Sequence, residues 1–347
     1  MRRLVHSLLF VCLFTGMLLF AGCPSQEPKK DPAAVGHVMP GRPAEYSTYS
    51  SYIEELKKNP AVEVTFHADK KTVKKIKATG KIGDDLFAKI GGLPTLRSLA
   101  LDRTDLSDET LAYIAQLPNL EELTLTQTAI SNEGVIALEG LTSLKRLRLS
   151  ENSLTDTCAA CFEKMTKLTD LDLSNTEIGN ETIAKISHLT QITKLNLYLT
   201  RISDECLEHL AKLENLTWLN LDKTEISDEK TEELQKLTKL TWIHLGTTKI
   251  SDKTLEHLAK LENLTWLNLD KAEISDEKTE ELQKLTKLAW IHLGNTKISD
   301  KTLGHLAGIR TLKELDVTDT RVTPQGVEML RQALPDCVVH ENVSEKE

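Results

Sequence analysis

The sequence has few aromatic residues and an excess of negative charge. It contains 4 Trp, 5 Tyr and 6 Phe among 347 residues, and its 43 Lys and Arg face 52 Asp and Glu for a net charge of -9. Any large core must therefore be aliphatic. The acidic balance argues against a nucleic-acid partner, because affinity for phosphates comes largely from Lys and Arg.

Cysteine is also scarce, and the usual catalytic signatures are missing. Six Cys exclude a disulfide-dense miniprotein, and 40% apolar residues exclude a wholly disordered chain. There is no G-x-S-x-G, no Walker loop, no G-x-G-x-x-G after a strand and no H-E-x-x-H. We therefore expect a non-enzymatic protein without a catalytic site, cofactor or metal.

Leucine, in contrast, is abundant and periodic. The chain has 57 Leu, and an L-x-L pair or its Ile-containing equivalent recurs every 24 residues. Such a period indicates a solenoid, which is one quasi-linear domain rather than two ordinary ones. The pairs begin at Leu99, Leu123, Leu147, Leu171, Leu195, Leu219, Ile243, Leu267, Ile291 and Leu315.

Each repeat predicts a strand, a bend and a short helix. Alternation places Leu219 and Leu221 on the inner side of a strand and Trp218 on the outer side. Ser or Thr followed by an acidic residue then marks a helix start, and Thr323-Pro324 repeats that signal. Strands stack more closely than helices, so we expect a curved stack with the strands on the concave face.

A short polar side chain occupies the fifth position after the first strand Leu. We expect it to accept hydrogen bonds from backbone N–H groups where the strand turns away. Ala272 lacks this group, which predicts a local loss of about 1 kcal/mol. The position holds Thr104, Thr128, Asn152, Thr176, Thr200, Thr224, Thr248, Ala272, Thr296 and Thr320.

Residues 213–227, LENLTWLNLDKTEIS, fit L-x-x-L-x-L-x-x-(N/T)-x-(L/I) and resemble the leucine-rich repeat family. The resemblance covers about residues 73–340 and is similar to the ribonuclease-inhibitor-like and bacterial envelope types. It implies an α/β fold: a curved solenoid with parallel strands on the concave face and short helices on the convex face. It also implies that the concave face is the ligand surface.

Both ends of a solenoid need closing. We expect a domain over 51–347: a cap and degenerate repeat at 51–98, ten repeats at 99–334, and a cap strand and tail at 335–347. Within the first cap, Ser51 to Asn59 predicts a helix and the stretch around Asp69-Lys70-Lys71 a hairpin.

The N-terminus predicts a leader. Arg2 and Arg3 precede an apolar stretch of 17 residues that ends at Phe20, a secretory design. Phe20-Ala21-Gly22-Cys23 resembles the lipobox of bacterial lipoproteins, in which the Cys is lipidated. We expect a signal peptide over 1–22, lipidation at Cys23 and a flexible tether over 23–50. An uncleaved anchor helix and an ordinary signal peptide are the alternatives.

All four Trp take the same outward position on consecutive strands. We hypothesise that they form a ligand-binding line, because exposed aromatic groups with polar neighbours often mark interaction sites. Edge-to-edge pairing that only stiffens the sheet is the alternative. The candidate ligand-binding residues are Trp218, Trp242, Trp266, Trp290, Tyr198, Asn220, His244, Asn268 and His292.

Acidic residues border this line, and Arg146 and Arg148 form a basic island. These charges favour a ligand with Lys or Arg, or a neutral glycan, over a polyanion. The acidic residues are Asp170, Asp172, Asp222, Asp270, Glu314 and Asp316.

Cys158 and Cys161 have redox or metal spacing, but no second pair completes a zinc set. We interpret them as small helix residues, and a disulfide between Cys158 and Cys161 is the alternative. His209, His257 and His305 lie two repeats apart and cannot converge on one metal.

Residues 203–250 and 251–298 differ at only five positions, Glu205/Lys253, Cys206/Thr254, Thr224/Ala272, Thr241/Ala289 and Thr247/Asn295, so a two-repeat unit has been duplicated.

Together these features predict a non-enzymatic protein that is lipid-anchored to a bacterial membrane, in the periplasm or at the cell surface, and binds a protein or glycan on its concave face. An envelope scaffold without a dedicated ligand is the alternative. An intracellular ubiquitin-ligase-type adaptor is a third reading, which the leader contradicts.

Overall fold

The computed structural model describes residues 46–342. They belong to one compact unit in which a single sheet follows the chain from strand to strand. The strands are β1 Val62–Phe66, β2 Val73–Ala78, β3 Ser98–Ala100, β4 Glu122–Thr124, β5 Arg146–Arg148, β6 Asp170–Asp172, β7 Lys194–Asn196, β8 Trp218–Asn220, β9 Trp242–His244, β10 Trp266–Asn268, β11 Trp290–His292, β12 Glu314–Asp316 and β13 Val338–His340.

Short helices connect these strands. The α-helices are α1 Tyr46–Lys58, α2 Asp84–Gly91, α3 Asp108–Ile114, α4 Asn132–Ala137, α5 Asn180–Ile186, α6 Leu207–Leu210, α7 Asp252–Leu258, α8 Asp300–Leu306 and α9 Pro324–Ala333. The 3-10 helices are η1 Leu138–Gly140, η2 Asp156–Lys164, η3 Asp204–Cys206, η4 Thr231–Lys236 and η5 Thr279–Lys284.

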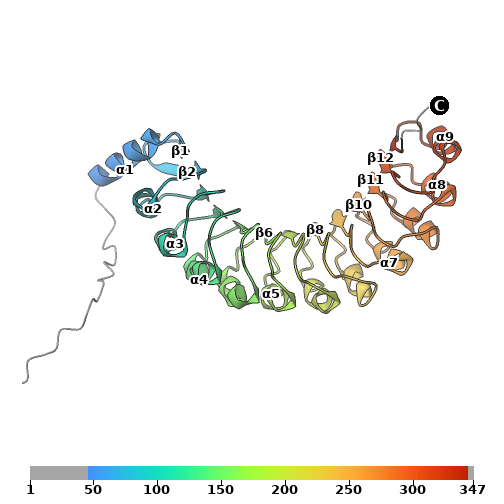
Figure 1. The fold of residues 1–347 in the computed structure, drawn as a ribbon, viewed down its shortest axis with the longest axis horizontal. Coiled ribbons are helices and arrows are strands. Elements are labelled where there is room, and N and C mark those ends of the chain that lie inside the picture. The colour runs from blue at the N-terminus through green and yellow to red at the C-terminus, as the bar shows by residue number, and fades with distance from the viewer. Residues whose placement is uncertain (1–45, 343–347) are drawn as a thin grey trace, which may run out of the picture. The chain divides into compact units, whose positions relative to one another are not determined.

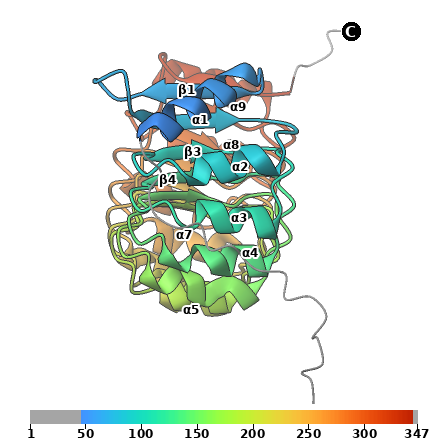
Figure 2. The ribbon, with the colours of Figure 1, turned by 90° about the vertical axis from the view of Figure 1, so that its left-hand side faces the viewer.

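The predicted solenoid is confirmed. From β2 onward every strand pairs in parallel with the next, and Leu219 opposite Ile243 is one step of a register without slippage. Strands line the inner side of the curved unit and helices the outer side (Figure 1). Seen from the other direction, α2 to α5 form one column (Figure 2). Paired residues of neighbouring strands are thus separated by the 24-residue period of the sequence.

The core is a continuous aliphatic stack, as the composition predicts. Leu219 and Leu221 on the strand and Leu207, Leu210 and Leu213 on the return side are all fully buried. Burial of a Leu side chain contributes about 2 kcal/mol relative to exposure. A single repeat cannot enclose its own Leu residues, so stability depends on the neighbouring repeats.

A hairpin and a further strand stand at the two ends of the repeats. β1 and β2 make the antiparallel hairpin, and β13 extends the sheet beyond the last repeat. Helix α1 begins at Tyr46 rather than at Ser51 and ends at Lys58. Cys23 and the expected signal peptide lie outside the described residues.

The Thr at the fifth position bonds in the direction opposite to our prediction. Its hydroxyl donates to the strand carbonyl three residues earlier, as in Thr224 Oγ1 to Leu221 O at 2.6 Å. Two members of the set also accept from the backbone: Asn152 at Thr128 N and Thr320 at Val322 N. The free group at this bend is a carbonyl, because the chain turns before the next strand can use it. At Ala272 the backbone N–H bonds the Leu269 carbonyl instead, at 3.1 Å.

Aspartate carboxylates form hydrogen bonds between neighbouring repeats, a feature that the sequence pattern did not predict. Asp228, in the turn before one helix, accepts the N–H of Ser251 at 2.8 Å and the hydroxyl of Thr254 at 2.8 Å in the next repeat. Asp204, Asp252, Asp276 and Asp300 repeat the pattern with a Ser or Thr 23 residues later. Each such Asp therefore holds the Ser or Thr that precedes the helix of the following repeat.

We expect Ala272→Thr to stabilise the protein by about 1 kcal/mol, because its hydroxyl would complete the hydrogen bond that Thr224 makes in the duplicated unit. Chemical denaturation of both proteins measures the difference. Thr224→Ala, the matched change in the first copy, should cost a similar amount. An unchanged midpoint for Ala272→Thr would show that the backbone bond already satisfies Leu269.

We expect Asp228→Ala to destabilise the fold by about 1 kcal/mol, because Ser251 and Thr254 lose their hydrogen-bond acceptor. Asp228→Asn should cost less, because Asn132 and Asn180 accept the same backbone bond natively. Burial raises the pKa of Asp228, but hydrogen bonds from Ser251 and Thr254 outweigh it and hold the pKa below its usual value.

The contribution of Asp228 is therefore fully present above its unfolded-state pKa and is lost as the pH falls through its folded-state pKa. Denaturation midpoints across the acid range should show a smaller decline for Asp228→Asn than for the wild type. Equal declines would mean that Asp228 does not contribute to the acid sensitivity.

Candidate functional site

The four Trp lie in one line on the concave face, at the first residue of β8, β9, β10 and β11. We call this set the Trp strip: Trp218, Trp242, Trp266 and Trp290. Parallel pairing places each opposite the next without a shift. The sheet register alone thus brings together residues that are 24 positions apart in the sequence.

The indoles stack face to face rather than edge to edge. Ring centroids are 4.3 Å apart between Trp218 and Trp242 with planes 12° apart, and 4.1 Å apart between Trp242 and Trp266 with planes 9° apart. Trp290 takes part in neither pair and is 40% exposed. Aromatic pairs of this kind contribute about 1 kcal/mol each beyond their buried area. The strip therefore stiffens the sheet, and its indole edges and the ring of Trp290 remain open to the concave side.

His244 and His292 flank the strip from the adjacent row. His244 meets Trp242 and Trp266 with its ring edge-on, at centroid distances of 5.7 and 5.6 Å. His292 lies 5.3 Å from Trp266. Burial lowers the pKa of His244, against the opposing charges of Asp222 and Asp270. His244 is accordingly more easily kept neutral than an exposed imidazole.

The predicted Asn and Tyr positions are largely occupied by internal bonds. The side chain of Asn220 accepts the N–H of Asp222 at 3.0 Å, and Asn268 does the same for Asp270 at 2.8 Å. Asn268 is only 5% exposed, so the expectation of an open ligand surface there needs correction. These turns hold the Asn side chains against their own backbone.

Tyr198 lies beside the strip and is paired with Lys223. The Lys223 ammonium donates to the Tyr198 hydroxyl at 2.7 Å and lies 5.0 Å from the ring centroid. This contact raises the pKa of Lys223. The pair places one cation at the end of the strip where Trp218 begins it.

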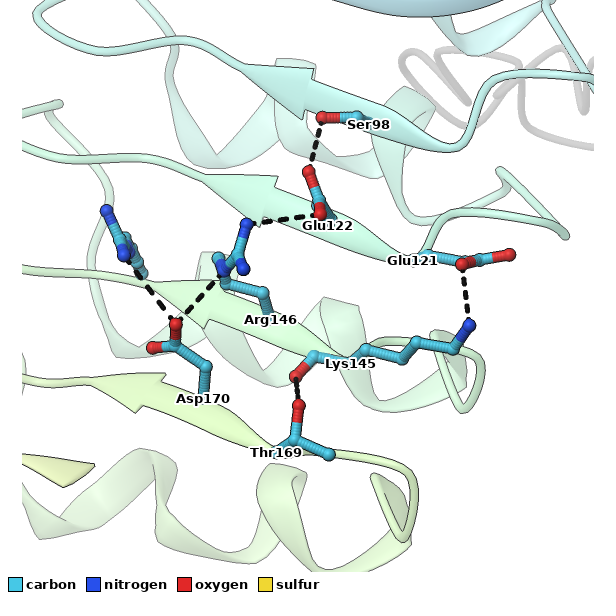
Figure 3. Close-up of polar contacts among 8 residues, drawn as sticks. Ser98, Glu121, Glu122, Lys145, Arg146, Thr169 and Asp170 are labelled. Carbon is cyan, nitrogen blue, oxygen red and sulfur yellow. Dashed lines mark hydrogen bonds and ion pairs between the residues drawn. The ribbon is translucent and has the colours of Figure 1, made fainter. Parts of the chain in front are cut away.

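The basic island is neutralised within the sheet. Arg146 pairs with Glu122 at 3.1 Å and with Asp170 at 3.0 Å, and Arg148 approaches Asp170 at 3.6 Å. Figure 3 shows these side chains on successive strands, with Ser98 donating to Glu122. This half of the concave face is a charge ladder, whereas the other half is aromatic.

The acidic residues beside the strip are less well paired. Asp222 is 7% exposed, its Oδ1 atom has no hydrogen-bond partner among residues 46–342, and its Oδ2 atom lies 3.7 Å from His244 Nε2. Burial, with the nearby charge of Asp316, raises the pKa of Asp270. Asp270, His292 and Asp316 each offer one donor atom, all within 4.8 Å of one another, so this group could hold a metal ion.

Sequence reasoning interpreted these acids as strand-face charges and missed the group. The signal was present as an Asp just after one strand followed by His and Asp at the last residue of the next two strands.

The remaining candidates are buried or used within the core. Cys158, Cys161 and Cys206 are free and buried, and burial raises the pKa of Cys158 to about 11, so it is inert as a thiolate. His257 and His305 bond Thr231 and Thr279 of the preceding repeats at 2.9 and 2.8 Å. They link helices rather than forming a site.

A separate hollow of about 760 Å³ lies in the N-terminal cap. Ile53, Phe66, Val73 and Leu93 contribute to its lining. The sequence could not reveal it, because helix α1 and the hairpin come together only in the fold.

Comparison with known proteins supports the repeat assignment. Family models described as leucine rich repeat match residues 118–178, 142–197 and 308–330. These segments coincide with the repeats described above. The repeats in these segments match leucine-rich repeats. No curated protein matches the chain.

Solved leucine-rich repeat structures share the fold. An internalin from Listeria monocytogenes aligns with a TM-score of 0.60 and 20% identity over 86% of this chain and 95% of its own. A leucine-rich repeat protein from Leptospira interrogans aligns with a TM-score of 0.52 and 21% identity over 75% of this chain and 74% of its own.

A plant receptor kinase ectodomain from Arabidopsis thaliana, GASSHO1/SCHENGEN3, was solved in complex with CASPARIAN STRIP INTEGRITY FACTOR 2. It aligns with a TM-score of 0.54 and 19% identity over 77% of this chain and 38% of its own.

Residues 46–342 contain no helix long and apolar enough to span a membrane.

Proposed function

We propose that this leucine-rich repeat protein is a non-enzymatic binding protein that holds a protein segment against the Trp strip. The observation that carries the proposal is the continuous line of four indoles on the concave face, with Trp290 40% exposed. Aromatic side chains bury much area at a small loss of conformational entropy, so they dominate binding energy where they gather.

The stacking geometry favours a protein over a glycan. A sugar ring packs on an open indole face, but the faces between Trp218 and Trp242 and between Trp242 and Trp266 are closed by stacking. Indole edges and N–H groups remain, and these suit peptide carbonyls and aliphatic side chains. A glycan partner would have to use the outermost rings alone.

The charges around the strip indicate the character of the partner. Asp222, Asp270 and Asp316 have no ion pair with a Lys or Arg among the described residues, whereas Arg146 is paired on both sides. An extended segment that carries Lys or Arg beside apolar side chains would complement this surface. The plant ectodomain in complex with its factor shows only that a solenoid of this kind can hold a partner.

The alternative is that the strip is purely structural. Stacked rings at 4.1 and 4.3 Å do stabilise the sheet, so an envelope scaffold without a ligand would keep them too. The exposed ring of Trp290 favours binding over this reading, since stiffening does not require an open aromatic surface.

We further propose that the protein is tethered outside the cytoplasm through Cys23. The support is the positively charged, apolar leader and the sequence Phe20-Ala21-Gly22-Cys23 that resembles a lipobox. A tether of about 20 residues would let the repeats stand clear of the bilayer.

The binding proposal predicts that Trp290→Ala and Trp242→Ala abolish partner capture. The first measurement is quantitative cross-linking on intact host cells, which identifies the partner. The second compares the affinity for that partner with the affinity for a variant of it in which Lys and Arg are replaced. Lys212→Ala on the convex side is the control and should not change capture. Loss of thermal stability with unchanged capture would favour the structural alternative, and binding of a glycan instead would appear on an array.

The anchor proposal predicts that the mature N-terminus is a lipid-modified Cys23. Mass spectrometry of the protein from its native host measures this directly, and Cys23→Ser should release the chain from the membrane fraction. An intact and unmodified Met1 would contradict both the anchor and the extracytoplasmic location.

A further inference from the structure

Three donor side chains of different strands meet at the C-terminal end of the Trp strip. Asp270 follows β10, His292 ends β11 and Asp316 ends β12, and parallel pairing sets His292 directly beside Asp316. One oxygen or nitrogen from each lies within 4.8 Å of the others, and all three side chains are partly exposed. A ligand can therefore reach the group from the concave side.

Hydrogen bonds hold Asp316 by one carboxylate oxygen and Asp270 by both. Asp270 Oδ1 accepts the N–H of Gly294 at 2.8 Å, and Asp316 Oδ1 accepts the N–H and hydroxyl of Thr318 at 2.9 and 2.8 Å. Asn268 also donates to Asp270 Oδ2 at 3.3 Å. Such supporting bonds orient metal ligands and reduce the ordering cost of coordination.

Gly294 keeps space beside the group. A Cβ atom there would lie 3.1 Å from Thr318 Oγ1 and 3.3 Å from Asp270 Oδ1, which is tighter than ordinary contact. Any larger residue would press on the carboxylate or its anchor.

The charge of the group is uncompensated. Neither Asp270 nor Asp316 forms an ion pair with a Lys or Arg in the part of the chain that the structure describes. Two ionised carboxylates at such close range cost free energy, because like charges repel each other. A bound cation would remove that cost.

We propose that Asp270, His292 and Asp316 form a binding site for a divalent transition metal ion of the zinc class. One imidazole and two carboxylates suit Zn²⁺, Co²⁺ or Ni²⁺, whereas Ca²⁺ and Mg²⁺ prefer oxygen ligands alone. Three protein ligands leave at least one coordination position for water or for a side chain of a partner. The site goes beyond the proposed binding function and needs no partner to form.

The duplication supplies an internal comparison. Asp222, His244 and Asn268 occupy the equivalent positions 48 residues earlier, with an amide where the other group has a carboxylate. His244 Nε2 lies 3.7 Å from Asp222 Oδ2, and the donor atoms of the later group lie within 4.8 Å of one another. A neutral amide is a weaker ligand for zinc-class ions, so the earlier group should bind metal poorly.

The test is titration of untagged, folded repeat protein with Zn²⁺ alone, by calorimetry, and with Co²⁺ by its visible absorption. The wild type should bind one equivalent. Asp316→Asn converts this group to the composition of the earlier one and should weaken binding more than about tenfold. Asn at this position can still accept the Thr318 N–H, so circular dichroism should be unchanged.

The reciprocal variant Asn268→Asp should add a second equivalent, which a merely structural effect would not do. His67→Ala is the control and should leave binding intact, because His67 follows β1 at the other end of the sheet from the group. No binding by the wild type, or equal binding by Asp316→Asn and the wild type, would overturn the proposal. Because no partner is present in this titration, its failure leaves the protein-binding proposal unaffected.

Discussion

Every repeat of this protein depends on the next repeat to satisfy its groups. The Leu side chains of one strand and helix are covered only when the neighbouring turn is in place, and the carboxylate of Asp228 finds its donors on Ser251, one repeat further on. The stacked Leu side chains and the hydrogen bonds from each Asp to the next repeat follow the same period. A shift of one strand against the next would therefore break both sets of contacts. This double constraint explains why the register runs without slippage from β2 to β13.

The same constraint shapes the concave face. A residue type that recurs at one outward position must form a row, because parallel pairing places each copy opposite the last. Charged residues in such a row alternate and neutralise one another, as Glu122, Arg146 and Asp170 do. Trp residues stack instead. The contrast between a charged half and an aromatic half thus arises from the residue types on an unchanged backbone, and the aromatic half keeps an exposed ring at Trp290.

Sequence reasoning succeeded where one residue decides the outcome. The position of each strand follows from Leu219 and its equivalents, and the helix start at Thr323-Pro324 follows from local chemistry. It failed where the geometry of a bend or a contact between repeats decides. The hydroxyl of Thr224 donates to Leu221 rather than accepting, the ring faces of Trp242 are closed, and Asn268 is buried. The metal-binding group was missed for the same reason, since its members belong to three repeats.

The distinctive chemistry lies where the duplicated unit ends. Within residues 203–298 each Trp lies opposite another Trp in the sheet, and Trp290, which lies between Trp266 and Glu314, keeps an exposed ring. At the same boundary, Asp316 takes the position that Asn268 holds in the copy, and this adds the second carboxylate beside His292. Duplication alone would only have extended a closed stack and an incomplete ligand set. At the junction with the unduplicated strand β12, the Trp stack ends in an exposed ring and the ligand set gains its second carboxylate. The proposed partner contact at Trp290 and the proposed metal site therefore lie at the same end of the strip.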